Sequence, residues 1–333
     1  MTFQDKLNKA IESENKEDFF SASHFYKDAL SYAIKIGDSG NIKLCKNKIV
    51  EMNKESIASG KDFKELSFTH ELSEEKQKIY DDFLKNFFDK NDLKSILDSI
   101  GKHPYFFPKV KKVQETTNKT MPVSYQVASL SAISDNGHAL RGGSDGDYAW
   151  FMKMYDISQQ TIIHLYIGKI FYELIENKPN NICLDFEKLS DYFSESEIFK
   201  ENNLKIIIVG LEKYFKKDYI SALHILIPRF ESAFLDISAK LGIDIVALEQ
   251  RCGISTRTKT LSETHLDSEE FKKIWGEDLC RQLKFVLFEQ MGYKLRHKIA
   301  HGEILHSECN FQNTTLILYF YIVLISRVVK NKT

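Results

Sequence analysis

The chain of 333 residues is long enough for about two domains of ordinary size, and its 43% hydrophobic residues can build real cores. Its 5 prolines and 15 glycines fall below average usage, which disfavours turn-rich all-β and disordered architectures. The 46 basic and 47 acidic side chains nearly cancel, so the overall charge does not indicate a nucleic-acid partner, and any such partner must be held locally. We therefore expect a mainly α-helical protein.

The amino-terminal segment and the cysteines favour a cytoplasmic setting. The opening "MTFQDKLNKAIESENKEDFF" carries charges throughout and lacks the apolar core of a signal peptide. The cysteines are scattered and form no C-x-x-C pair, which argues against a disulfide framework and a zinc ribbon. They are Cys45, Cys183, Cys252, Cys280 and Cys309.

Two helical groups are expected in the first hundred residues. Over residues 6–53, "FFSASHFYKDALSYAIKIGD" places its apolar residues mostly on one face, as in a helix hairpin. The string A-x-x-F-Y-x-x-A-L resembles half of a tetratricopeptide repeat, but no second copy follows at a period of about 34 residues. Residues 73–100 again space their apolar side chains by three and four.

An irregular region is expected next, because "HPYFFPKV" breaks the helical pattern with two prolines. The D-N-G string at residues 135–137 favours a tight turn, so we expect a small β-hairpin near 124–140. We therefore assign residues 1–103 to a helical sensor or interaction region, 104–155 to an irregular linker and 156–333 to a helical bundle.

The carboxy-terminal bundle is predicted from longer and more apolar helices, at about 157–176, 204–216, 219–241, 271–292, 293–305 and 314–330. The polar segment "RCGISTRTKTLSETHLDSEE" is expected to be a long connection. The uncharged "TTLILYFYIVLIS" is 13 residues long, short of the roughly 20 that span a bilayer. We interpret it as a buried core helix, and we expect no membrane partner.

The stretch "LRHKIAHGE" brings together side chains suited to phosphate chemistry. On a helix, His297 and His301 lie four residues apart on one face, and Arg296 reaches over from the next position. Arginine clamps two phosphate oxygens, and imidazole exchanges a proton near neutrality. From Arg281 to Gly302 the sequence holds five Lys or Arg against one acid, an excess that would attract an anionic substrate.

Structural interpretations stay open for the same residues. Arg296 and Lys298 also suit a solvated helix face, and His301 a core histidine beside a close-packed Gly302. The H-x-x-x-H spacing also suits a helical metal pair, with only Glu303 and His306 nearby as further ligands. We expect no metal and no cofactor.

Arg296 followed by His301-Gly302 resembles the R-x4-6-H signature of the HEPN superfamily (higher eukaryotes and prokaryotes nucleotide-binding). More narrowly, "GYKLRHKIAHG" resembles the G-x-N-L-R-N-x-x-A-H-G ending of one helical HEPN branch. Upstream, "YFKKDYISALHILIPRFESAFLDISAKLG" resembles its helix pair, in which a P-x-x-E occurs, here Pro228 and Glu231. The resemblance covers roughly residues 204–306.

This resemblance implies an α-helical bundle, commonly a homodimer whose motif helices face each other across a composite cleft. Many members are metal-independent endoribonucleases, in which a ribose 2′-hydroxyl attacks its own 3′-phosphate and leaves a cyclic phosphate and a 5′-hydroxyl. Members often act as toxins or antiviral defence effectors, so we expect RNA and an activating or inhibiting protein as partners.

The resemblance also assigns roles to residues. His301 would be the acid/base residue and Arg296 the clamp on the developing phosphate charge. His297 occupies a position that is usually Asn, so it either orients the phosphate or acts as a second imidazole. Glu231 either orients Arg296 or forms a structural salt bridge.

Three further residues complete the predicted site: Gly302 supports the motif helix, and Lys294 and Lys298 would bind substrate. The alternative function is that of a noncatalytic helical module, which binds RNA, a nucleotide or another protein.

Overall fold

The computed structural model describes residues 2–61, 73–89, 92–122, 130–133, 137, 139–143, 146–249 and 255–328. These residues are mainly helical, and their strands form two-stranded antiparallel sheets, β1–β2 and β3–β4. The chain divides into two compact units. Met1–Glu71 and Pro122–Ala149 form the first, and Leu72–Met121 and Trp150–Thr333 form the second. The predicted mainly α-helical fold is confirmed.

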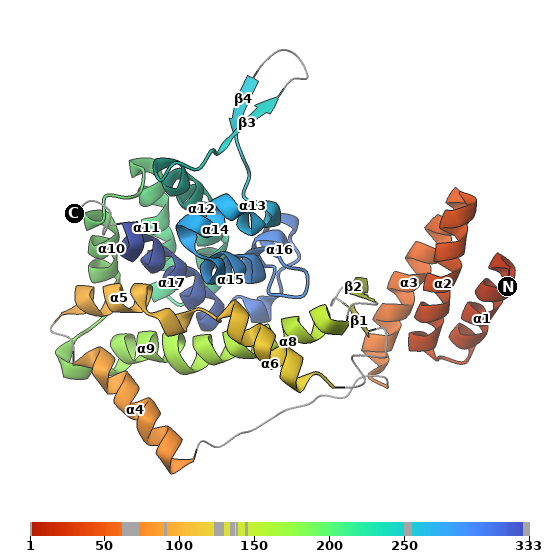
Figure 1. The fold of residues 1–333 in the computed structure, drawn as a ribbon, viewed down its shortest axis with the longest axis horizontal. Coiled ribbons are helices and arrows are strands. Elements are labelled where there is room, and N and C mark those ends of the chain that lie inside the picture. Colours follow the sequence, from red (N-terminus) through yellow and green to blue (C-terminus); the bar gives the residue numbers. More distant parts are fainter. Residues whose placement is uncertain are drawn as a thin grey trace. The chain divides into compact units, whose positions relative to one another are not determined.

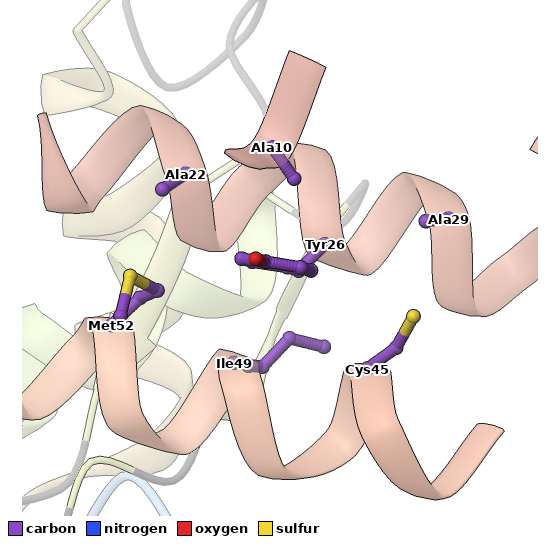
Figure 2. Close-up of a cluster of buried hydrophobic side chains, with 7 residues drawn as sticks. All are labelled: Ala10, Ala22, Tyr26, Ala29, Cys45, Ile49 and Met52. Carbon is purple, nitrogen blue, oxygen red and sulfur yellow. The ribbon is translucent and has the colours of Figure 1, made fainter. Parts of the chain in front are cut away.

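Three helices form most of the first unit: α1 (Phe3–Asn15), α2 (Phe19–Ile36) and α3 (Ser39–Ser59). Asp18 and Asp38 begin α2 and α3, where each carboxylate accepts a hydrogen bond from a backbone N–H of the first turn. The helices close over a small core in which Tyr26 lies among aliphatic and sulfur side chains (Figure 2). Its members are Ala10, Ala22, Tyr26, Ala29, Cys45, Ile49 and Met52.

A hairpin completes the first unit. Strands β1 (Leu130–Ile133) and β2 (Ala139–Gly143) pair antiparallel, which confirms the hairpin expected near 124–140. Residues 124–129, 134–136 and 138 lie outside the described residues. The buried Asn53 amide donates to the carbonyl of Gly137 at 2.7 Å and accepts from the Ser23 hydroxyl at 2.6 Å. Hydrogen bonds of a buried amide therefore join the hairpin to α2 and α3.

The second unit contains the remaining elements, and α8 begins in the first unit and ends in the second. In chain order they are α4 (Glu74–Phe88), α5 (Leu93–Lys102), η1 (Pro104–Phe106), α6 (Val110–Thr120), α8 (Gly146–Thr161), η2 (Ile162–Ile167), α9 (Gly168–Tyr172), η3 (Glu173–Asn177), η4 (Pro179–Asn181), α10 (Phe186–Glu195), α11 (Glu201–Phe215), α12 (Tyr219–Lys240), β3 (Val246–Glu249), β4 (Ser255–Thr258), α13 (Glu263–Asp267), α14 (Glu269–Trp275), α15 (Glu277–Leu287), α16 (Leu295–His301), η5 (His306–Glu308) and α17 (Phe311–Val328). Figure 1 shows α17 in dark blue among the other helices of this unit.

Helix α17 forms the centre of the second unit's core. It is long and apolar enough to cross a membrane, yet every residue from Thr314 to Ser326 is buried within the unit. The hydroxyl of Tyr321 donates to the carbonyl of Leu226 on α12 at 2.8 Å, so its polar end is satisfied inside the core. The prediction of a buried core helix is confirmed.

The observed division of the chain differs from the predicted boundaries at residues 103 and 155. Helix α5, which was grouped with the amino-terminal helices, buries Ile96, Leu97 and Ile100 and packs on α17. The predicted linker 104–155 contains η1 and α6, which lie in the second unit, and the hairpin of the first. Helical periodicity identifies a buried face, but it does not identify the helix that covers it.

The structure also corrects two predictions in the bundle, one for a helix and one for a connection. The helix expected at 271–292 is divided, because Gly276 adopts a positive φ of 87° between α14 and α15. The segment expected to be a long connection, residues 251–270, contains β4, α13 and the start of α14. Strand β4 pairs with β3 so that Val246 lies opposite Thr258. This hairpin is mostly exposed and extends from the helical body (Figure 1), so no buried face marked its strands in the sequence.

We expect Gly101→Ala to destabilise the second unit, because a Cβ there would lie 2.2 Å from Ser326 Oγ and 2.8 Å from the carbonyl of Ile322 on α17. Overpacking of this kind costs about 1–3 kcal/mol, measurable by urea denaturation. The control is Gly40→Ala in α3, where the nearest atom would lie at 3.5 Å and no loss is expected. An unchanged unfolding midpoint in Gly101→Ala would contradict the close contact of α5 with α17.

Candidate active site

The motif lies on α16, a helix of seven residues that is shorter than the predicted 293–305. Leu295 is fully buried and anchors its first turn. The helix ends because Gly302 takes a left-handed φ of 68°, and the next amide, of Glu303, donates to the carbonyl of Lys298 at 2.7 Å. A Cβ on Gly302 would meet nothing within 4 Å, so backbone conformation and not close packing requires glycine here.

The two motif histidines contact each other. The ring centroids of His297 and His301 lie 4.2 Å apart, with the rings inclined by 46°. His301 is exposed and His297 is partly buried. The structure therefore brings both imidazoles to one surface position, and His301 is not a core histidine.

Arg296 is held from two sides. Its Nε donates to Glu231 Oε2 on α12 at 3.1 Å, and its guanidinium carbon lies 5.8 Å from the ring centroid of Phe288. The other Glu231 oxygen accepts from the amide of Leu261 at 2.9 Å. Among the residues that the structure describes, the terminal Nη atoms of Arg296 make no hydrogen bond. These contacts fix the guanidinium while leaving its fork available to a ligand.

The two lysines predicted to bind substrate both have carboxylate partners. Lys294 Nζ lies 3.8 Å from Glu303 Oε2, and Lys298 forms an ion pair with Glu308. Both side chains are about four-fifths buried, with 19% and 21% of their surface exposed. The structure thus leaves neither charge uncompensated, and only Lys294 is among the charges that act on His297.

The local positive charge inferred from residues 281–302 does not describe the folded surface. Arg281 Nη1 lies 3.6 Å from Glu289 Oε2, and Lys284 Nζ lies 2.6 Å from Asp267 Oδ2. Every Lys and Arg in this segment therefore has a carboxylate neighbour, and most of these carboxylates come from outside the segment. The carboxylates are Glu231, Glu263, Asp267, Glu289, Glu303 and Glu308. Folding brings most of these carboxylates to the segment from elsewhere in the chain, so its sequence alone does not give the local charge.

The pKa of His297 is lowered from its ordinary value. Partial burial is the largest cause, followed by the charges of Lys294, His301 and Arg296, while Glu303 opposes them. Both burial and nearby cations disfavour the imidazolium form. The neutral imidazole, which can accept a proton, is therefore favoured at neutral pH.

Sequence reasoning missed Phe288 and the acidic partners of the lysines. Phe288 is the residue after α15. Its ring lies close to the Arg296 guanidinium because the chain reverses between α15 and α16, and no local spacing in the sequence indicates this contact. Among the described residues, no three His, Cys, Asp or Glu side chains gather in a group that could hold a metal ion.

The chain has no detectable relative in the comparisons with known proteins. No family model, no curated protein and no solved structure matches it. The resemblance to HEPN proteins therefore depends on the motif and the helix pair before it, and any functional argument has to come from the geometry of the site.

We expect Lys294→Met to raise the pKa of His297 toward its ordinary value of 6.5, because the substitution removes a neighbouring cation. An NMR titration of the ring nitrogens measures this pKa.

A lowered folded-state pKa of His297 means that the unfolded chain binds the proton more readily, so the free energy of unfolding decreases as pH falls below about 6.5. Lys294→Met should lessen this decrease.

The matched control is Lys298→Met in α16, since Lys298 is not among the causes of the shift in the pKa of His297. Its His297 pKa should equal that of the unchanged protein. A Lys294→Met protein with the same His297 pKa as the control would contradict the electrostatic account.

Proposed function

We propose that this chain is a metal-independent RNA endonuclease of the HEPN type, which cleaves by attack of a ribose 2′-hydroxyl. The observation that supports it most is the arrangement on α16. Two imidazoles in contact lie beside a guanidinium that Glu231 and Phe288 hold in place. This arrangement offers a proton acceptor, a proton donor and a fixed cation, which are the groups that phosphodiester transesterification needs.

In the proposed reaction the 2′-oxygen bonds to phosphorus and the bond to the 5′-oxygen breaks. His297, whose lowered pKa favours the neutral form, accepts the 2′-hydroxyl proton. His301, the more exposed imidazole, gives a proton to the departing 5′-oxygen. Arg296 binds the non-bridging oxygens as charge builds on the phosphorane. Glu231 positions Arg296 and does not touch the substrate.

The ring separation favours a composite site. Attacking and leaving oxygens lie roughly in line on opposite sides of the phosphorus, whereas His297 and His301 of one copy contact each other at 4.2 Å. Two rings in contact leave no room for a phosphate between them. We therefore propose that two copies form a homodimer with facing α16 helices, and that each copy supplies one imidazole to the bound RNA.

One observation favours a noncatalytic module instead: carboxylates compensate the lysine charges around α16. Lys294 and Lys298, the expected substrate contacts, are both paired with carboxylates. Under that alternative, the motif only packs within the bundle, or binds RNA, a nucleotide or another protein without cleaving it. The two functions predict different results for substitutions that leave the fold intact.

We expect purified protein in EDTA to cleave labelled RNA, and Arg296→Ala and His301→Ala to lose at least about a hundredfold in rate. Denaturing gels of timed samples measure this. The controls are Arg257→Ala and His24→Ala, which remove exposed residues of the same types elsewhere. Thermal unfolding of each variant shows whether the fold is retained. Equal cleavage by all five proteins would contradict the assignment.

The composite site predicts that two different defective copies can complement each other. A dimer of one His297→Ala chain and one His301→Ala chain, isolated through two different affinity tags, should retain about half of the activity of the unchanged dimer, because one of its two sites keeps both imidazoles. Complete loss of activity in this mixed dimer would mean that each protomer works alone. A monomer with full activity would likewise contradict the composite cleft.

A further inference from the structure

A second site is suggested by an aromatic cavity of about 280 Å³ in the second unit. Its walls come from α9 and the π-helical turn after it, and from α11, α12 and the start of α17. None of its lining residues belongs to the candidate active site. Most of the wall is aromatic, formed by Tyr172, Tyr214, Phe215, Tyr219 and Phe311.

One wall of the cavity is rigid. Tyr214 is 2% exposed, and its hydroxyl shares a hydrogen bond of 2.8 Å with Thr315. Its ring stacks with Phe311 at a centroid distance of 5.9 Å, and Tyr219 meets Tyr214 edge-on at 6.0 Å. Tyr172 comes from a different helix and is 47% exposed. A flat ligand would thus meet fixed aromatic groups and one accessible tyrosine.

The lining also carries one acid and one base. Lys217 Nζ lies 3.3 Å from Glu176 Oε1, and both side chains are well exposed. Lys217 has a left-handed φ of 60° in the short turn between α11 and α12. A carboxylate and an ammonium therefore lie side by side, and both can turn toward a ligand without disturbing the core.

The volume of the cavity and the charges around it limit the kind of ligand that it can bind. The volume lies just below the range of about 300–1,000 Å³ that encloses drug-sized molecules, so it suits a single fused ring system. An aromatic wall also attracts quaternary ammonium groups. Here, however, Lys169 Nζ already lies 5.5 Å from the ring centroid of Tyr172 and pairs with Glu173 at 2.6 Å, and Lys217 pairs with Glu176, so the cavity offers no unbalanced negative charge to a cation. A neutral planar heterocycle fits better.

We propose that this cavity binds a guanine base. Guanine carries N–H donors at N1 and N2 beside the acceptor O6. Glu176 would accept from N1 and N2, Lys217 would donate to O6, and the aromatic side chains would stack on the rings. Adenine has an amino group in place of O6, so it would offer Lys217 no acceptor there. This inference does not depend on the proposed nuclease activity.

The test is isothermal titration of the full-length protein with GMP, AMP and choline. GMP should bind with a Kd below about 1 mM and at least about tenfold more tightly than AMP. Tyr172→Ala should weaken GMP binding by about fivefold or more. Glu176→Gln should reduce the preference for GMP over AMP, because it replaces a carboxylate that accepts from N1 and N2 with an amide that has a single acceptor oxygen. The matched controls are the exposed residues Tyr105→Ala and Glu187→Gln, which should change neither value.

A second arm distinguishes a free nucleotide from a base within RNA. Short single-stranded oligoribonucleotides with one guanosine are compared with GMP. Tighter binding of GMP indicates a free nucleotide as ligand, and tighter binding of the oligonucleotide indicates a base within a strand. The proposal would be overturned if neither GMP nor the oligonucleotide binds up to about 5 mM. It would also be overturned if AMP binds as tightly as GMP, if choline binds more tightly than GMP, or if Tyr172→Ala leaves GMP binding unchanged.

Discussion

Burial of α17 is the constraint on which the second unit depends. Thirteen consecutive residues of this helix, Thr314 to Ser326, lie inside the core, and α5 and α12 pack directly on it. Burying that much apolar surface is favourable only if the polar groups among it are satisfied. The hydroxyls of Tyr319 and Tyr321 meet this condition by donating to backbone carbonyls of Phe106 and Leu226.

The candidate site follows from this packing. Because α12 is fixed on α17, it presents Glu231 at a defined place, and Glu231 in turn holds Arg296 on α16 and the amide of Leu261. A short helix that begins after a left-handed Lys294 and ends at Gly302 would be marginal alone. Its position is set by the buried Leu295 and by the Arg296–Glu231 ion pair.

What could be predicted from the sequence was local. The spacing of His297 and His301 predicted that their side chains meet, and the apolar run near residue 320 predicted a buried helix. Contacts between residues far apart in the sequence could not be predicted in this way. The packing of α5 on α17 changed the domain boundaries, and the carboxylates of Glu303 and Glu308 neutralised lysines that looked available. A charge count along the chain does not include groups brought in by folding.

The most direct test of the proposed chemistry is the identity of the RNA ends, determined by mass spectrometry after incubation with purified protein in EDTA. Attack by a 2′-hydroxyl predicts fragments with a 2′,3′-cyclic phosphate and a 5′-hydroxyl. These fragments should be lost in the Arg296→Ala and His301→Ala proteins. Fragments with a 3′-hydroxyl and a 5′-phosphate, or cyclic phosphates that persist in both variants, would contradict the account.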